Sequence, residues 1–242
     1  MNIALLGHGN MGKEIERLLR ESGRHTYFSV EPKMEQITTK NLAKADVAID
    51  FTSPEIVLQN IKTVLSAGKN MVVGTTGWYG HIKEIGELVK KNGVGLIYGQ
   101  NFSIGANIFF RLVSEATKLA ASAGTYDVFG LELHHTGKKD SPSGTALRVA
   151  QEILDNSKTK KILVTDKLER KINPEELHFA SVRGGRNPGF HEVVFESSAD
   201  SITISHQAHS REGFAEGAIF AAEFIAGKKG LYTFDDAVKT LL

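Results

Sequence analysis

The sequence of 242 residues predicts an α/β protein built from two domains. In its first hundred residues, short apolar runs alternate with segments whose apolar residues recur at helical spacing, which is typical of βαβ units around a parallel sheet. After a predicted helix over 108–121, the strands become longer and alternate apolar with polar residues, which favours a mostly antiparallel or mixed sheet. A glycine-rich turn directly after the first apolar run adds a nucleotide-binding signal to this pattern.

The elements of the first domain follow from this alternation. Apolar runs predict strands within 3–6, 26–31, 47–51, 70–77 and 94–102. Helical spacing predicts three helices, which follow the glycine turn, carry the residues Ile56 to Leu65, and cover 81–91.

The second domain is predicted to be an α+β unit. It contains a strand within 126–135 and a hairpin over 191–209 that turns at Ala199–Asp200. A final helix over 214–226 is expected to return to the first domain. The predicted domains are therefore 1–105 with 214–242, and 106–213.

Composition and charge exclude several classes of function. The formal net charge is +1, so there is no general electrostatic reason to bind nucleic acid or a membrane surface. Cysteine is absent, which rules out disulfides, thiolate metal sites and a cysteine nucleophile. No apolar run approaches the roughly 20 residues of a membrane-spanning helix. We expect a cytoplasmic protein with a small-molecule partner, no metal site, no nucleic acid and no membrane.

The turn after the first predicted strand carries the pattern G-x-G-x-x-G at Gly7, Gly9 and Gly12. Gly7 permits the tight turn, Gly9 lets the backbone approach a pyrophosphate, and Gly12 permits close packing of helix and strand. The helix N-terminus that follows favours a negatively charged ligand. The context predicts a Rossmann-type dinucleotide site, which also includes His8, Asn10 and Met11.

Three further segments complete the predicted cofactor site. Glu31 ends the second predicted strand, where an acidic side chain accepts hydrogen bonds from the adenosine ribose and repels a 2′-phosphate. Two loops follow later strands, at the edge where open α/β sheets bind ligands. These loops are expected to line the nicotinamide side with Gly74, Thr75, Thr76, Gln100, Asn101 and Phe102.

The stretch LHHTGKKDSPSGTAL, residues 133–147, gathers two histidines and two lysines before a predicted helix. In a strand over 128–135, Glu132 and His134 share one face and His135 takes the other. A histidine beside lysines can exchange a proton with a bound anion near neutral pH.

The helix that follows this stretch predicts an anion site. Ser143 is placed to cap a helix that runs to about Asp155. Free backbone N–H groups at Gly144 and Thr145 would then favour a carboxylate or a phosphate.

These motifs resemble the 4-hydroxy-tetrahydrodipicolinate (dihydrodipicolinate) reductases, NAD(P)H-dependent enzymes of lysine biosynthesis. The resemblance covers nearly the whole chain and rests on the strings GHGNMG, AIDFTSP, VVGTTGW, GQNFSIGAN, ELHHTGKKDSPSGTA and SHQAHSREGFAEGA. It implies reduction of a cyclic dicarboxylate in the diaminopimelate route to lysine, and a homotetramer associated through the second domain.

The resemblance also implies residue roles. His134 and Lys138 match the family's catalytic histidine and lysine. His135, Gly144 and Thr145 match its substrate-binding residues. The residues already assigned to the dinucleotide, together with Gly99, match its cofactor loops.

The chain departs from the family pattern at places that bear on the cofactor. The glycine turn is one residue shorter than the common form, and Asn10 and Pro32 stand where arginines are frequent. With Glu31, these changes favour NADH over NADPH. Lys139 stands beside Lys138, and the four-residue spacing from His134 selects Lys138.

Two other functions remain as alternatives. The first domain also fits another two-domain NAD(P)-dependent dehydrogenase, or a nucleotide-sensing module without turnover. The roles of Arg183, Arg186 and Arg211 stay open. His191 and His206 fall on predicted strand faces among apolar residues and are interpreted as structural.

Overall fold

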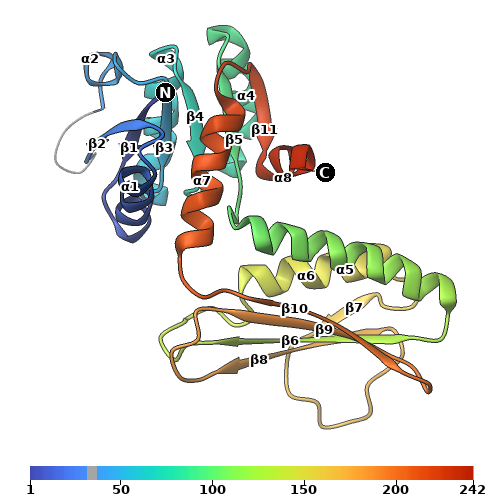
Figure 1. The fold of residues 1–242 in the computed structure, drawn as a ribbon. Helices are drawn as coiled ribbons and strands as arrows, with labels where there is room; N and C mark the ends of the chain where they lie inside the picture. The colour runs from blue at the N-terminus through green and yellow to red at the C-terminus, as the bar shows by residue number, and fades with distance from the viewer. Residues whose placement is uncertain (32–36, 242) are drawn as a thin grey trace. The chain divides into compact units, whose positions relative to one another are not determined.

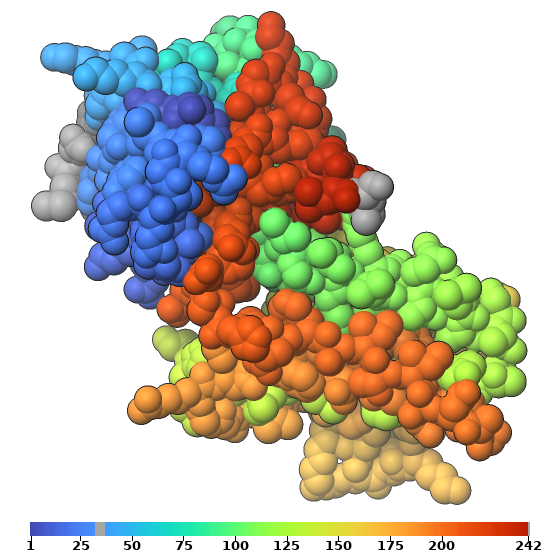
Figure 2. All heavy atoms as spheres, in the orientation of Figure 1, coloured from blue at the N-terminus to red at the C-terminus, as the bar shows by residue number. Residues whose placement is uncertain are grey.

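The structure, a computed structural model, describes residues 1–31 and 37–241. It divides into two compact units, of which the first comprises Met1–Ile104 and Arg211–Leu242 and the second Gly105–Ser210. The C-terminal residues, red in Figure 2, pack with the N-terminal part of the chain in the first unit. The prediction of an α/β fold with one parallel and one mixed sheet is confirmed.

The first unit is built on a six-stranded parallel sheet with the order β11-β5-β4-β3-β1-β2 (Figure 1). The strands are β1 (Asn2–Leu6), β2 (Thr26–Val30), β3 (Val47–Asp50), β4 (Asn70–Val73), β5 (Gly95–Tyr98) and β11 (Gly230–Thr233). The sequence pattern did not predict β11, because it is only four residues long and half-buried along its length.

Helices cover both faces of this sheet. They are α1 (Asn10–Ser22), α2 (Thr39–Leu42), α3 (Pro54–Ser66), α4 (Ile82–Asn92), α7 (Glu212–Ile225) and α8 (Phe234–Val238), with short 3₁₀ turns η1 (Tyr79–His81) and η2 (Lys239–Leu241). Alternate residues of β1 enter opposite cores, since Ile3 and Leu5 pack against α1 and α7 whereas Ala4 and Leu6 pack on the α3 side. The central strands are therefore apolar on both faces, as in other parallel sheets.

The second unit has a five-stranded mixed sheet with the order β10-β9-β6-β8-β7. The strands are β6 (Asp127–His134), β7 (Ile162–Val164), β8 (Glu176–Arg183), β9 (Phe190–Glu196) and β10 (Ser201–Gln207). The β10–β9–β6 pairs are antiparallel, and the β6–β8–β7 pairs are parallel. The predicted hairpin is the β9–β10 pair.

Two helices, α5 (Ile104–Ala123) and α6 (Gly144–Asn156), cover one face of the mixed sheet. Phe109 and Val149 of these helices share a core with Phe179 and Phe195 of the strands. Within the described residues, no helix is long and apolar enough to cross a membrane.

Candidate cofactor and active sites

The predicted cofactor loops all begin at one edge of the parallel sheet. The strand ends Leu6, Val30 and Asp50 are paired in register, and Val73 and Tyr98 continue the same row. Because every strand runs the same way, the glycine turn, Glu31 and the loops after β4 and β5 start side by side. Ligands of open α/β sheets bind at this carboxyl edge.

The three glycines of the turn have different local environments. Gly7 has a φ of +86°, which favours glycine, and a Cβ at Gly12 would lie 2.2 Å from the Gly7 carbonyl oxygen. A Cβ at Gly9 would meet no atom within 4 Å. Glycine is thus required at position 7 by the backbone conformation and at position 12 by close packing, whereas Gly9 leaves open space beside the backbone.

The start of α1 fits an anionic group. Its N-cap, Gly9, has no side chain to cap the first turn, and that turn contains no acidic residue. The backbone N–H groups and the positive end of the helix dipole are therefore suited to a pyrophosphate. Glu31 is held nearby, since the His8 amide donates a hydrogen bond of 3.0 Å to Glu31 Oε2.

The other cofactor loops offer less than the sequence suggested. Thr75 is buried and donates from its hydroxyl to Asp50 at 2.7 Å, and the Phe102 ring packs in the core against Phe51 and Phe234. The side chains of Thr75 and Phe102 therefore face the protein, and only their backbone groups are available to a ligand. Pro32, which in the sequence counts in favour of NADH over NADPH, lies outside the described residues.

The Asp50 carboxylate connects the loops that follow β3 and β4 through hydrogen bonds. Its fully buried carboxylate accepts hydrogen bonds from the Thr52 amide and hydroxyl, the Asn60 amide group and the Thr75 hydroxyl. Burial raises the pKa of Asp50, and the four donors oppose this rise. One carboxylate thus fixes the loops after β3 and β4 at the edge of the sheet.

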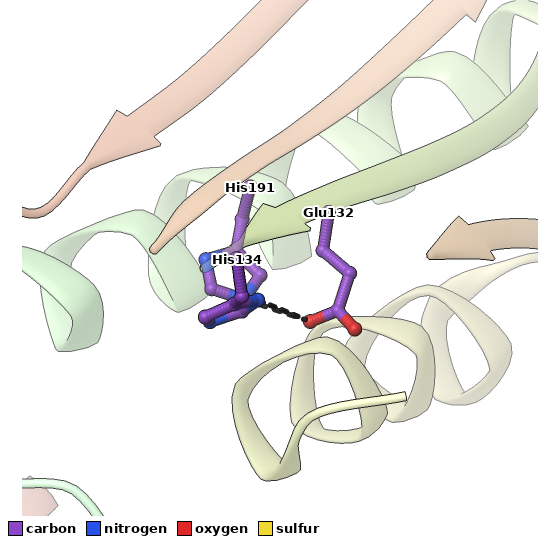
Figure 3. A group of neighbouring side chains, drawn as sticks. All are labelled: Glu132, His134 and His191. Atoms are coloured by element: carbon purple, nitrogen blue, oxygen red, sulfur yellow. Dashed lines mark ion pairs between the residues drawn. The ribbon is translucent and has the colours of Figure 1, made fainter. Parts of the chain in front are cut away.

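In the second unit, a buried carboxylate and two buried histidines converge on the helix-covered face of the sheet (Figure 3). Glu132, His134 and His191 are 0%, 6% and 4% exposed. Strand register creates this group, because Glu132 of β6 pairs with His191 of β9 and with Ser181 of β8. We use the name Glu132 cluster for Glu132, His134, Ser143, Ser181, Arg183 and His191.

Three donors hold one oxygen of the Glu132 carboxylate. The Ser143 amide donates to Oε1 at 3.0 Å, and the Ser181 hydroxyl and Arg183 guanidinium each donate at 2.8 Å. Burial alone would raise the pKa of Glu132. Contacts with His191 and with these three donors outweigh burial and hold the pKa well below its ordinary value. The carboxylate is therefore ionised at neutral pH.

The second oxygen faces the two histidines. Oε2 lies 3.3 Å from Nδ1 of His134 and 3.4 Å from Nε2 of His191, within ion-pair distance. Among the described residues, neither Oε2 nor His134 Nδ1 has a hydrogen bond of good geometry. Nε2 of His191 lies 3.2 Å from the Ser143 hydroxyl.

His134 is neutral in the unliganded chain. Burial lowers the pKa of His134 to about 4, Glu132 opposes this shift, and His191, Lys138 and Arg183 add to it. At neutral pH its imidazole is therefore able to accept a proton. A bound anion would favour the protonated form, since it would offset the positive charges of Lys138 and Arg183.

The three converging side chains offer ligand atoms within 4.8 Å of one another, a spacing compatible with a metal ion. The charge of the site opposes such a role. Arg183 already pairs with Glu132 at 2.8 Å, so little negative charge is left for a divalent cation. The arrangement is better suited to proton exchange than to metal binding.

The predicted anion site begins at the same cluster. Ser143 is the N-cap of α6, and its hydroxyl accepts from the Ala146 amide at 3.1 Å. A Cβ at Gly144 would meet nothing within 4 Å, so the first turn opens on free space. Lys138 donates to both carboxylate oxygens of Asp140, at 2.8 and 3.0 Å.

The glycine-rich segment 184–189 lies along His134 and His135. The His135 amide donates to the Asn187 carbonyl at 2.8 Å, and the Gly184 amide donates to the His134 carbonyl at 2.9 Å. A Cβ at Gly189 would lie 3.1 Å from Nε2 of His134. The segment thus shapes the space around the imidazole.

Sequence reasoning missed part of the cluster. The sequence pattern favours a structural role for His191, yet its ring lies against that of His134, with centroids 5.1 Å apart. The sequence alone assigns no role to Arg183 and places Glu132 only on one face of its strand. The sequence does show one such polar residue on each of three otherwise apolar or alternating strands, namely Glu132, Arg183 and His191. That they converge depends on strand register.

Comparisons with solved structures first define the class. An amine dehydrogenase from Mycobacterium smegmatis matches with a TM-score of 0.61 at 11% identity, covering 97% of this chain and 95% of that one. A dipicolinate-bound dihydrodipicolinate reductase from Paenisporosarcina matches with a TM-score of 0.74 at 24% identity, covering 98% of both chains. Both likenesses show the fold, a parallel-sheet unit of the dinucleotide-binding type combined with a mixed-sheet unit.

Sequence comparisons then give the family. Models described as dihydrodipicolinate reductase, N-terminus and C-terminus, match residues 1–102 and 105–238. A 4-hydroxy-tetrahydrodipicolinate reductase of Christiangramia forsetii is 38% identical, covering 100% of this chain and 99% of the relative. One of Methanocaldococcus jannaschii is 37% identical, covering 94% and 83%. The chain belongs to the dihydrodipicolinate reductase family.

Proposed function

We propose that this protein reduces 4-hydroxy-tetrahydrodipicolinate to tetrahydrodipicolinate with NADH or NADPH, a step of lysine and diaminopimelate biosynthesis. The observation that carries this proposal is the buried, neutral His134 next to a capped helix start and a lysine. Such a site can hold a carboxylate and exchange a proton with the same ligand.

The start of α6 is the proposed carboxylate site. The Gly144 and Thr145 backbone and the Thr145 hydroxyl would hold one carboxylate of the substrate. Lys138, drawn from Asp140, and His135 would hold and orient the rest of the anion. A cyclic dicarboxylate matches a site with one helix N-terminus and one ammonium group.

His134 is the proposed acid–base group. The reaction removes the hydroxyl group together with one ring hydrogen as water, and adds one hydride and one proton to the ring. The dinucleotide supplies the hydride. As the dicarboxylate binds, its negative charge raises the pKa of His134, which can then carry the proton. Lys138 stabilises negative charge that develops on the ring during transfer.

The first unit is the proposed cofactor domain. The start of α1 and the turn from Gly7 to Gly12 would hold the pyrophosphate, and Glu31 the adenosine ribose. The backbone after β4 and β5 would line the nicotinamide. A ribose-binding acid and the absence of arginine at Asn10 support a preference for NADH.

The test of this function is oxidation of NADH and of NADPH, measured separately, with substrate made from pyruvate and aspartate semialdehyde by the preceding enzyme. Substrate-dependent oxidation, faster with NADH, is the expected result. His134→Ala should lower turnover by a factor on the order of one hundred. If folded protein that binds NADH shows no substrate-dependent oxidation of either cofactor, the proposal is overturned in favour of another dehydrogenase or a cofactor sensor.

The cofactor preference has its own test. Glu31→Ala should weaken NADH more than NADPH, because the ribose contact matters most where no 2′-phosphate is present. The exposed Glu87→Ala, on α4, is the matched control and should change neither affinity. Equal losses for both cofactors would contradict the assignment of Glu31.

A homotetramer associated through the second unit is part of the proposal. The outer face of the mixed sheet, opposite α5 and α6, carries Phe129 at 39% and Val182 at 52% exposure. Exposed apolar residues on a strand face are suited to burial against another subunit. Light scattering should give four times the chain mass, and Val182→Glu should reduce it.

A further inference from the structure

Four buried polar atoms of the Glu132 cluster lack hydrogen-bond partners within the described residues: Oε2 of Glu132, Nδ1 of His134, Nδ1 of His191 and Nε of Arg183. Of these, Oε2 of Glu132 and Nδ1 of His134 lie 3.3 Å apart. Buried polar groups are nearly always paired, so an unpaired donor and an unpaired acceptor at this distance are each other's natural partners. The competing nitrogen, Nε2 of His191, already contacts the Ser143 hydroxyl at 3.2 Å.

We propose that Glu132 is the positioning residue of His134: its Oε2 accepts the Nδ1–H of the neutral imidazole and leaves the Nε2 lone pair for the substrate. The proposal rests on the proposed function only in this last step, where Nε2 meets a reacting ring. The tautomer itself is a property of the free protein.

The carboxylate is held rigidly enough for this role. Three donors from Ser143, Ser181 and Arg183 converge on Oε1, so the carboxylate cannot rotate without breaking all three hydrogen bonds. A positioned acceptor fixes both the ring plane and the tautomer of the histidine it contacts.

The same carboxylate connects the proton site to the anion site. The Ser143 amide donates to Glu132, and the Ser143 hydroxyl accepts from the Ala146 amide in the first turn of α6. His134 and the start of α6 therefore share one fixed point. A shift of Glu132 would displace both, although they are separated by a nine-residue segment of the chain.

Glu132→Gln isolates the positioning role. The three donors on Oε1 require an acceptor, so the amide oxygen should take that place and the NH₂ group should face His134. An NH₂ group donates to Nδ1 and moves the imidazole proton to Nε2. The matched control is Glu176→Gln, a buried β8 carboxylate paired with Arg170 and not with a histidine.

The measurement is nitrogen NMR of the full-length protein labelled at histidine, with the His134 signals assigned by His134→Asn. The expected wild-type form is the Nδ1–H tautomer, which Glu132→Gln converts to Nε2–H while Glu176→Gln does not. Turnover of Glu132→Gln should fall about a hundredfold or more, with KM changed only a few-fold and NADH affinity unchanged.

A wild-type His134 that carries its proton on Nε2 would overturn the proposal, and this reading needs no variant to fold. An unchanged tautomer in Glu132→Gln would overturn it as well. If the tautomer changes as expected but the wild-type protein does not reduce the proposed substrate, the positioning role stands and the proposed function fails.

Discussion

Ser143 and Glu132 are joined by a buried hydrogen bond of 3.0 Å from the Ser143 amide to Glu132 Oε1. The bond connects the residue that caps α6 with the carboxylate that faces His134. Glu132 is fully buried and Ser143 is 2% exposed, so solvent cannot replace the contact. The helix start and the imidazole are therefore placed by a common internal anchor.

Stability should decrease as the pH falls from 6.5 toward 4. The pKa of His134 is about 4 in the folded chain against an ordinary value of 6.5, because burial disfavours the charged ring. A depressed pKa contributes stability that is present above 6.5 and is lost through this window. His134→Gln should reduce the loss between pH 6.5 and 4.5 by about 2 kcal/mol.

The measurement is denaturant unfolding at a series of pH values. His81→Gln, which removes an exposed histidine paired with Glu84, is the control and should keep the wild-type slope. His206 should add a smaller loss of the same sign, because burial also lowers its pKa. Parallel curves for His134→Gln and wild type would show that His134 is not desolvated.

Gly189→Ala should impair the acid–base site without affecting cofactor binding. A Cβ there would lie 3.1 Å from Nε2 of His134, so the methyl group would crowd the nitrogen proposed to meet the substrate. Turnover should fall at least tenfold, since small displacements of a catalytic group are costly. Gly184→Ala, whose Cβ would meet nothing within 4 Å, should retain wild-type kinetics.

The sequence predicted those parts of the molecule that depend on local periodicity. The parallel strands β1 to β5, the glycine turn and the Ser143 cap all follow from neighbours in the chain. The Glu132 cluster does not, because His134 pairs with Arg183 and Glu132 with His191 across strands. The pairing register between strands that lie far apart in the sequence cannot be read from the sequence of either strand alone. The sequence did not predict β8, whose inner face begins with the buried Leu177 and Phe179 and ends with Ser181 and Arg183, which both donate to Glu132.

Gly9→Ala and Gly12→Ala should separate ligand binding from folding. A Cβ at Gly12 would lie 2.2 Å from a carbonyl oxygen, so Gly12→Ala should destabilise the fold by several kcal/mol, about 3. Gly9 has open space, so Gly9→Ala should unfold like wild type but bind NADH at least tenfold more weakly. Calorimetric titration and denaturant unfolding measure the two effects. Normal NADH affinity in Gly9→Ala would contradict the pyrophosphate site.

Asp50→Asn should weaken both the fold and cofactor binding. The Asp50 carboxylate accepts four hydrogen bonds while fully buried, and an asparagine would present an NH₂ group to at least one of these donors. An unsatisfied buried donor costs about 2 kcal/mol, which denaturant unfolding would detect. The loops after β3 and β4 would also lose their common anchor, so NADH affinity should fall as well.

Asp46→Asn is the control for this variant. Asp46 lies just before β3 and accepts a hydrogen bond of 2.7 Å from the Asn2 amide at an exposed position. Its replacement should cost less than about 1 kcal/mol, because water can satisfy the groups it leaves. If both variants lose equal stability and Asp50→Asn keeps its NADH affinity, the buried carboxylate does not organise the cofactor loops.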